Sequence, residues 1–233
     1  MSLDSNTRAL AQQIIDQYPQ SRSALLPMLH LVQAEEGYVT PEGIAFCADV
    51  LGITRAEVGA VATFYTMYKR HPTGEHLVSV CTNTLCGLLG GDKIYKALKE
   101  DLGVGHDETT ADGSITLEHA ECLAACDYAP VVTVNYEFFD NQSVESAREL
   151  VSALRAGEKP QPTRGGRLTS FRDAERELAG VLDPALEAEK VAAEDSIEPS
   201  LRGLKLARSK NERAPQADYD SVIPPVPAKE EKK

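Results

Sequence analysis

The spacing of the cysteines constrains this chain more than any other feature of its 233 residues. Cys81 and Cys86 form a C-x4-C pair, Cys122 and Cys126 form a C-x3-C pair, and 35 residues separate the two pairs. The N-terminus MSLDSNTRALAQQIIDQ lacks the uninterrupted apolar stretch of a secretory signal peptide. The thiols are therefore expected in a reducing compartment, where structural disulfides are rare. The pattern predicts one site built from four thiolates.

Three kinds of thiolate site are open to such a pattern. Structural zinc usually takes two C-x2-C pairs about 15–20 residues apart, whereas both intervals here are wider. Redox-active dithiols favour C-x-x-C, which is absent. A [2Fe–2S] cluster needs two thiolates per iron, and a pair from each of two adjacent loops supplies them, although the plant-type ferredoxin spacing does not fit. Spacing alone favours the cluster and leaves zinc and a redox pair as alternatives.

The charge of the chain excludes one class of partner. There are 24 Lys and Arg against 36 Asp and Glu, a net charge of −12. Residues 1–160 carry 11 basic and 22 acidic groups, so 11 of the 12 net negative charges lie there. Because this part would repel a phosphate backbone, nucleic acid is not expected as a partner. No apolar run approaches the roughly 20 residues of a membrane span, so a cytoplasmic protein is predicted, which can still sit on a membrane complex.

The first 74 residues have the pattern of a small helical bundle. Helices are predicted over 5–18, 23–36, 40–52 and 54–68. Thr40-Pro41 is a good helix start, and Thr54 and Glu57 have capping-box spacing. The body of the last helix, VGAVATFYTMY, is apolar almost all round, so we expect it to be buried between domains or under a partner.

The pattern of residues 75–157 predicts a compact α/β domain, and the residues after it are predicted to form an extension. Strands are expected over 77–81, 115–117, 131–134 and 137–139, with helices near 91–102 and 143–154 packed on a small mixed sheet. The extension spans 158–233, and seven of the 13 prolines lie in residues 161–233, with few aromatics. It has too little apolar surface for a core of its own, so it is expected to be largely irregular, disordered or ordered only against a partner.

Four ordered segments carry a resemblance to a known family. They are GAVATFYTMY (59–68), PTGEH (72–76), VCTNTLC (80–86) and ECLAACDYAP (121–130). Together they resemble the small [2Fe–2S] subunits of the NADH-oxidising module of respiratory complex I, the family of the NADH–quinone oxidoreductase E subunits, from about residue 10 to residue 157. The resemblance implies an α+β fold, with an N-terminal helical bundle followed by a thioredoxin-like ferredoxin domain.

The resemblance also implies a function and a ligand set. Cys81 and Cys86 would ligate one iron of a [2Fe–2S] cluster, and Cys122 and Cys126 the other. The chain would exchange single electrons with FMN on a neighbouring flavoprotein subunit that binds NADH, and would also contact the large iron–sulfur subunit. The assembly would be the peripheral arm of a proton-pumping NADH–quinone oxidoreductase, on the inner face of the cell membrane.

Within that enzyme the chain would carry no catalytic residue of its own. We find no fingerprint for a nicotinamide or flavin site in the sequence. Two alternatives remain open. One is the equivalent diaphorase subunit of a NAD-reducing hydrogenase or formate dehydrogenase, and the other is a zinc-stapled scaffold protein.

Several further residues carry more specific expectations. The family usually has C-L-G-x-C at the second pair, and this chain has Ala124 where glycine is expected; if the position needs a positive φ, alanine strains the loop. Cys47 is expected to be a buried packing residue. The backbone N–H groups of 82–84 are expected either to donate to the cluster or to serve ordinary turn chemistry. His119 is expected at the surface, with tuning of the cluster as the alternative.

Overall fold

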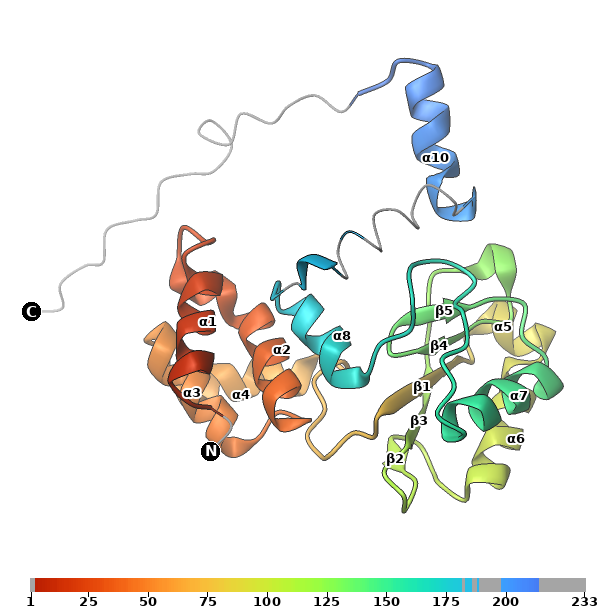
Figure 1. Cartoon of the computed structure of the whole chain (residues 1–233), viewed down its shortest axis with the longest axis horizontal. Helices are drawn as coiled ribbons and strands as arrows, with labels where there is room; N and C mark the ends of the chain where they lie inside the picture. The colour runs from red at the N-terminus through yellow and green to blue at the C-terminus, as the bar shows by residue number, and fades with distance from the viewer. Residues whose placement is uncertain (1–2, 182, 186–187, 189–197, 214–233) are drawn as a thin grey trace, which may run out of the picture. The chain divides into compact units, whose positions relative to one another are not determined.

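A computed structural model describes residues 3–181, 183–185, 188 and 198–213. The chain forms two compact units, Met1–Ser196 and Ile197–Lys233. In the second unit the described residues contain one helix, α10 (Glu198–Ser209) (Figure 1). The expected irregular tail after residue 213 lies outside the described residues.

Four α-helices and one short 3-10 helix form the N-terminal bundle. They are α1 (Ser5–Ile15), η1 (Ser21–Ala24), α2 (Leu25–Glu36), α3 (Pro41–Leu51) and α4 (Arg55–Phe64). The predicted starts are confirmed: Thr40 accepts a hydrogen bond from Gly43 ahead of Pro41, and Thr54 and Glu57 form a reciprocal capping box. The core contains fully buried residues of α2, such as Met28 and Leu29.

The last helix of the bundle is shorter and less buried than expected. α4 ends at Phe64, because Tyr65 adopts an extended conformation (φ −99°, ψ 131°). Val58 and Ala62 face the core, whereas the Phe64 side chain is 76% exposed and Tyr65 and Met67 are also exposed. The apolar run therefore does not form one helix buried all round within this chain.

A five-stranded mixed sheet forms the second domain, in the order β2-β3-β1-β4-β5. Its strands are β1 (His76–Cys81), β2 (Glu108–Thr109), β3 (Ile115–Ala120), β4 (Val132–Val134) and β5 (Glu137–Phe139). β1 and β3 are parallel and the other pairs are antiparallel. Every residue of the central strand β1 is buried, including the polar His76 and Ser79.

Helices α6 (Gly91–Leu102) and α7 (Val144–Arg155) lie side by side and pack on this sheet (Figure 1). Ile94 and Leu98 of α6 and Leu150 and Val151 of α7 join the buried core of the sheet. A two-residue turn at 135–136 joins β4 to β5, with φ of 48° and 71°. Two consecutive positive φ values are typical of the tight turns that match the twist of a hairpin.

Part of the expected irregular extension is folded onto these two domains. Residues Phe171–Leu178 form helix α8, which packs on α2 (Figure 1). Leu168 is buried in the core of the sheet domain and Ala179 in the core of the bundle. The extension lacks a core of its own, as expected, but its few apolar residues fill positions in cores that already exist. Apolar content alone did not predict that residues 160–181 would pack on the two domains of the same chain.

Candidate functional site

Both cysteine loops leave the same edge of the sheet. β1 ends at Cys81 and β3 ends at Ala120, and these two residues are paired in register. Because the two strands are parallel, their carboxyl ends meet at one edge, and the loops that carry the cysteine pairs start there side by side. The topology therefore brings together two pairs that are far apart in the sequence.

The first pair is buried. The Cys81 backbone N–H donates to the Val131 carbonyl at 3.0 Å. Cys86 lies on the short helix α5 (Thr84–Leu89), and both side chains are 3% exposed. A Cβ at Gly91 would overlap the Cys81 carbonyl oxygen and lie 3.0 Å from that of Cys86. Glycine at this position lets the first turn of α6 approach the cysteine loop closely.

The second pair lies on an exposed loop and on the 3-10 turn η2 (Cys126–Tyr128) that follows it. The Cys122 sulfur accepts a hydrogen bond from the Ala124 backbone N–H at 3.4 Å. Ala124 has φ of 55°, so the position where the family usually has glycine is indeed left-handed, and alanine is strained there. A cis peptide bond precedes Pro130 just beyond.

The two loops are packed together through a small apolar cluster. Its buried members are Cys81, Cys86, Ala125 and Val131, with Leu123, Ala129 and Phe138 at its margin. The Cys81 sulfur lies 3.9 Å from the carbonyl oxygen of Glu121, the residue before Cys122. Burial, and then the neighbouring Cys81 thiol, raise the pKa of Cys86 to about 11. A thiolate at Cys86 therefore needs a compensating positive charge, such as a metal ion supplies.

This donor set fits a two-iron cluster. It offers an inner buried pair and an outer exposed pair of thiols on two loops in contact. Among the described residues, no three His, Cys, Asp or Glu side chains converge as the ligands of a single ion would. A [2Fe–2S] cluster would need two thiolates for each iron, which the two cysteine pairs could supply.

Other residues considered from the sequence lie apart from this site or serve the fold. Cys47 is fully buried in the helical bundle, where burial raises the pKa of its thiol to about 12. The Thr82 N–H donates to Ala120, and the Thr84 N–H to the side chain of Asn83, which caps α5. The first bond continues the β1–β3 pairing, and the second is turn chemistry. The His119 ring packs on His106, with ring centroids 4.2 Å apart.

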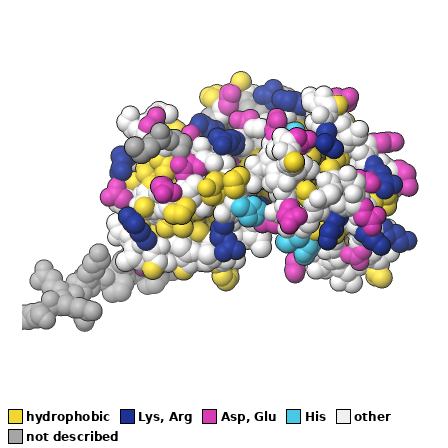
Figure 2. Space-filling model, turned by 90° about the horizontal axis from the view of Figure 1, so that it is seen from below, with side chains coloured by type: hydrophobic (Ala, Val, Ile, Leu, Met, Phe, Trp, Pro, Cys, Tyr) yellow, Lys and Arg dark blue, Asp and Glu magenta, His cyan; other side chains and the backbone are white. Residues whose placement is uncertain are grey.

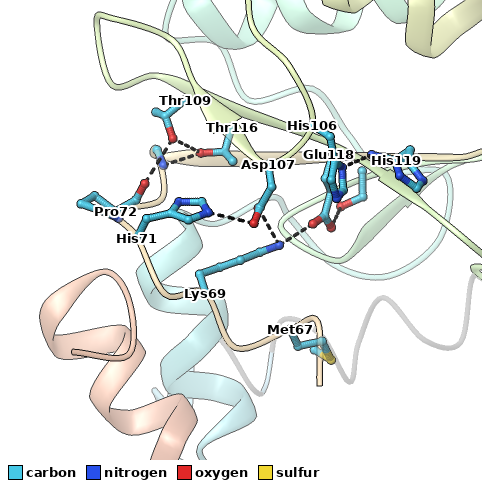
Figure 3. A network of polar contacts seen from close by, with 12 residues as sticks. Met67, Lys69, His71, Pro72, His106, Asp107, Thr109, Thr116, Glu118 and His119 are labelled. Atoms are coloured by element: carbon cyan, nitrogen blue, oxygen red, sulfur yellow. Dashed lines mark hydrogen bonds and ion pairs between the residues drawn. The ribbon is translucent and has the colours of Figure 1, made fainter. Parts of the chain in front are cut away.

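A buried polar network near the site was not predicted from the sequence (Figure 3). The Lys69 side chain is 3% exposed and its ammonium group contacts Asp107 at 3.0 Å and also Glu118. Ser79 donates to Glu118 at 2.6 Å, and His71 contacts Asp107 at 2.8 Å. The signal that could have indicated it is Glu118 itself, a carboxylate within a strand of the sheet that is largely buried and requires a partner.

The environment of this network favours the ionised forms of Lys69 and Asp107. Burial acts to lower the pKa of Lys69, but Glu118 and then Asp107 more than compensate and raise it. Burial likewise acts to raise the pKa of Asp107, and Lys69 and then His71 bring it below its usual value.

A hollow of about 630 Å³ extends from Lys69 to Cys122 and Leu123 of the second cysteine loop. Histidines gather on the face seen in Figure 2, among acidic and basic side chains.

The fold and the cysteine edge define a class of protein. The family model of the thioredoxin-like [2Fe–2S] ferredoxins matches residues 11–155, and the chain belongs to this family. The chain is 60% identical over 205 residues to the E subunit of the NADH-quinone oxidoreductase of Mycobacterium tuberculosis, covering 88% of this chain and 80% of that protein. It is 39% identical over 157 residues to the E subunit of the Rickettsia bellii enzyme, covering 66% and 94%. The predicted family and fold class are thus confirmed.

A solved structure shows a likeness in fold alone. It is a NAD+-reducing [NiFe]-hydrogenase, with a TM-score of 0.51 and 17% sequence identity. The match covers 57% of this chain and 23% of the hydrogenase chain.

Proposed function

We propose that this chain is an electron-transfer subunit of NADH–quinone oxidoreductase, and that Cys81, Cys86, Cys122 and Cys126 ligate one [2Fe–2S] cluster. One observation carries the ligand assignment: the in-register parallel pair β1–β3 delivers both cysteine loops to one edge of the sheet. The assignment to this enzyme rests on the 60% identity to the mycobacterial E subunit.

The protein supplies two different environments around the site. When bound, a [2Fe–2S] cluster accepts and releases one electron at a time. Cys81 and Cys86 would hold it on the buried side, while Cys122 and Cys126 lie at the surface. Electrons would therefore enter and leave at the exposed loop.

The proposed partners are a flavoprotein subunit that binds FMN and NADH and the large iron–sulfur subunit, in the peripheral arm at the inner face of the cell membrane. Exposed apolar side chains support docking at two places, the end of α4 with Phe64 and Tyr65, and α5 with Leu88 and Leu89. Among the described residues, no helix has the length and apolar character to cross a membrane. The hydrogenase diaphorase subunit is kept as an alternative because the solved hydrogenase shares the fold.

Reconstitution tests whether this chain holds the cluster while the flavoprotein subunit oxidises NADH. The isolated chain should hold about two iron and two labile sulfide atoms, give one S = 1/2 signal after dithionite reduction, and neither bind NADH tightly nor reduce ferricyanide with it. A stable heterodimer with the flavoprotein subunit should gain NADH oxidation. Four irons, zinc, or NADH oxidation by the flavin-free chain would contradict the proposal. Companion subunits purified from native membranes decide between the oxidoreductase and the hydrogenase.

A further inference from the structure

A carboxylate with no exposed surface lies outside the cysteine site. Glu175 of α8 is 0% exposed. One of its oxygens lies 2.6 Å from Nδ1 of His30 on α2, and the other accepts a hydrogen bond from the Tyr136 hydroxyl at 2.7 Å. His30 belongs to the helical bundle and Tyr136 to the β4–β5 turn of the ferredoxin domain. One buried side chain therefore bonds both domains at once.

The segment around Glu175 is fastened to the ferredoxin domain by its backbone. The Phe171 N–H donates to the Glu75 carbonyl at 2.9 Å, and the side chain of Asn135 donates to the Thr169 carbonyl at 2.8 Å. Leu168 is buried in the core of the same domain. These contacts hold the start of α8 against the residues that lead into β1 and around the β4–β5 turn.

The same segment is fastened to the helical bundle by its side chains. Arg172 donates to the Glu35 carbonyl at 3.1 Å, and Arg176 forms an ion pair with the Glu35 carboxylate. Ala179 is buried in the core of the bundle. The segment around Glu175 thus makes both polar and apolar contacts with each of the two domains.

We propose that residues 160–181 are an intramolecular strap that fixes the helical bundle to the ferredoxin domain, with Glu175 as its latch. If the domains separated, the buried carboxylate would lose a partner while still within protein, and an unpaired buried charge is costly. The family model matches residues 11–155, so the strap lies outside the matched region. The strap keeps the exposed aromatics Phe64 and Tyr65 at a fixed position relative to the cysteine edge.

Hydrogen exchange of the full-length protein tests the latch. Glu175→Gln keeps the size of the side chain and removes the charge. Because a hydrogen bond to a buried charged group contributes about 1.5–3 kcal/mol, the amides of Phe171 and Ala174 should exchange roughly ten- to hundredfold faster than in the wild type. Amides of the β1–β3 ladder should keep their rates. Tyr136→Phe removes one bond only and should give a smaller increase at the same amides.

The matched control is Glu149→Gln, the same change at an exposed position of α7, which should leave all rates unchanged. Two results would overturn the proposal. Unchanged exchange at Phe171 and Ala174 in both test variants would show that Glu175 fastens nothing. Equal acceleration throughout, including the β1–β3 ladder, would show that Glu175 contributes to global stability rather than to a separable fastening.

Discussion

Cys81 is paired with Ala120 at the last position of two parallel strands. This register decides where the site lies, because both loops must start from the same edge of the sheet. A shift of the register by two residues would displace one loop by about 7 Å, more than the span of a two-iron cluster permits. The alignment of β1 with β3 is thus as much a part of the site as the cysteines themselves.

The first prediction separates the ligands from the remaining cysteine. Alanine at Cys81, Cys86, Cys122 or Cys126 should abolish or degrade the cluster, seen as lost iron, sulfide and visible absorbance. Cys47→Ala is the control, since Cys47 lies in the core of the bundle; it should keep the full cluster and lose about 1–2 kcal/mol of stability. Loss of iron in the Cys47 variant would mean that the ligand set is wrong.

The second prediction concerns the strained alanine. Ala124 has φ of 55°, so Ala124→Gly should relieve strain and raise the free energy of unfolding by about 0.5–1 kcal/mol, after the entropic cost of glycine. It should also shift the potential of the cluster without changing its iron content. Ala125→Gly is the matched control: Ala125 is buried with φ of −120°, so this change should destabilise. A loss of stability in both variants would argue against strain at Ala124.

Removal of the buried ammonium group gives the third prediction. Lys69→Met leaves Glu118 and Asp107 without their cation and should cost about 3–5 kcal/mol in urea unfolding. Adding Glu118→Gln should restore part of that loss, because the second change removes one of the unpaired charges. Lys96→Met, at an exposed lysine of α6, should have no measurable effect. Additive losses in the double variant would contradict the coupling.

The fourth prediction is a dependence of stability on pH. Burial lowers the pKa of His76 below 6.5, and burial followed by His119 lowers that of His106. The folded protein therefore binds fewer protons than the unfolded chain just below pH 6.5. Stability from these histidines is fully present above that pH and is lost as the pH falls through their folded-state pKa values. Urea unfolding between about pH 7.5 and 5 measures the slope, and His76→Gln should make it shallower. An unchanged slope would exclude His76 as a source.

Local sequence signals were enough for most of the fold. Thr40 before Pro41 and the Thr54–Glu57 pair mark helix starts because caps are made by near neighbours. The alternation of apolar segments gave four of the five strands. The two-residue strand β2 was missed, since it is short and exists only by pairing with β3.

Contacts between residues far apart in the sequence could not be predicted from local sequence signals. The four cysteines were recognised by their spacing, but Lys69 and Glu118 are 49 residues apart and carry no spacing signal. Glu175 looks like an ordinary surface residue of an amphipathic helix until α2 and the β4–β5 turn close around it. The positive φ of Ala124 was anticipated only as a condition, because it depends on how the loop folds over the sheet edge.

The burial of Glu175 has a consequence for how this protein can change during evolution. Positions 30, 136 and 175 come from three separate elements, yet each is acceptable only in the presence of the others. Replacing the glutamate by an apolar residue would leave the buried histidine and the tyrosine hydroxyl without a hydrogen-bond partner. Replacing either partner first would leave the carboxylate without one of its two hydrogen bonds. We therefore expect the three positions to covary among relatives, and those without α8 to carry residues other than His and Tyr at the matching sites.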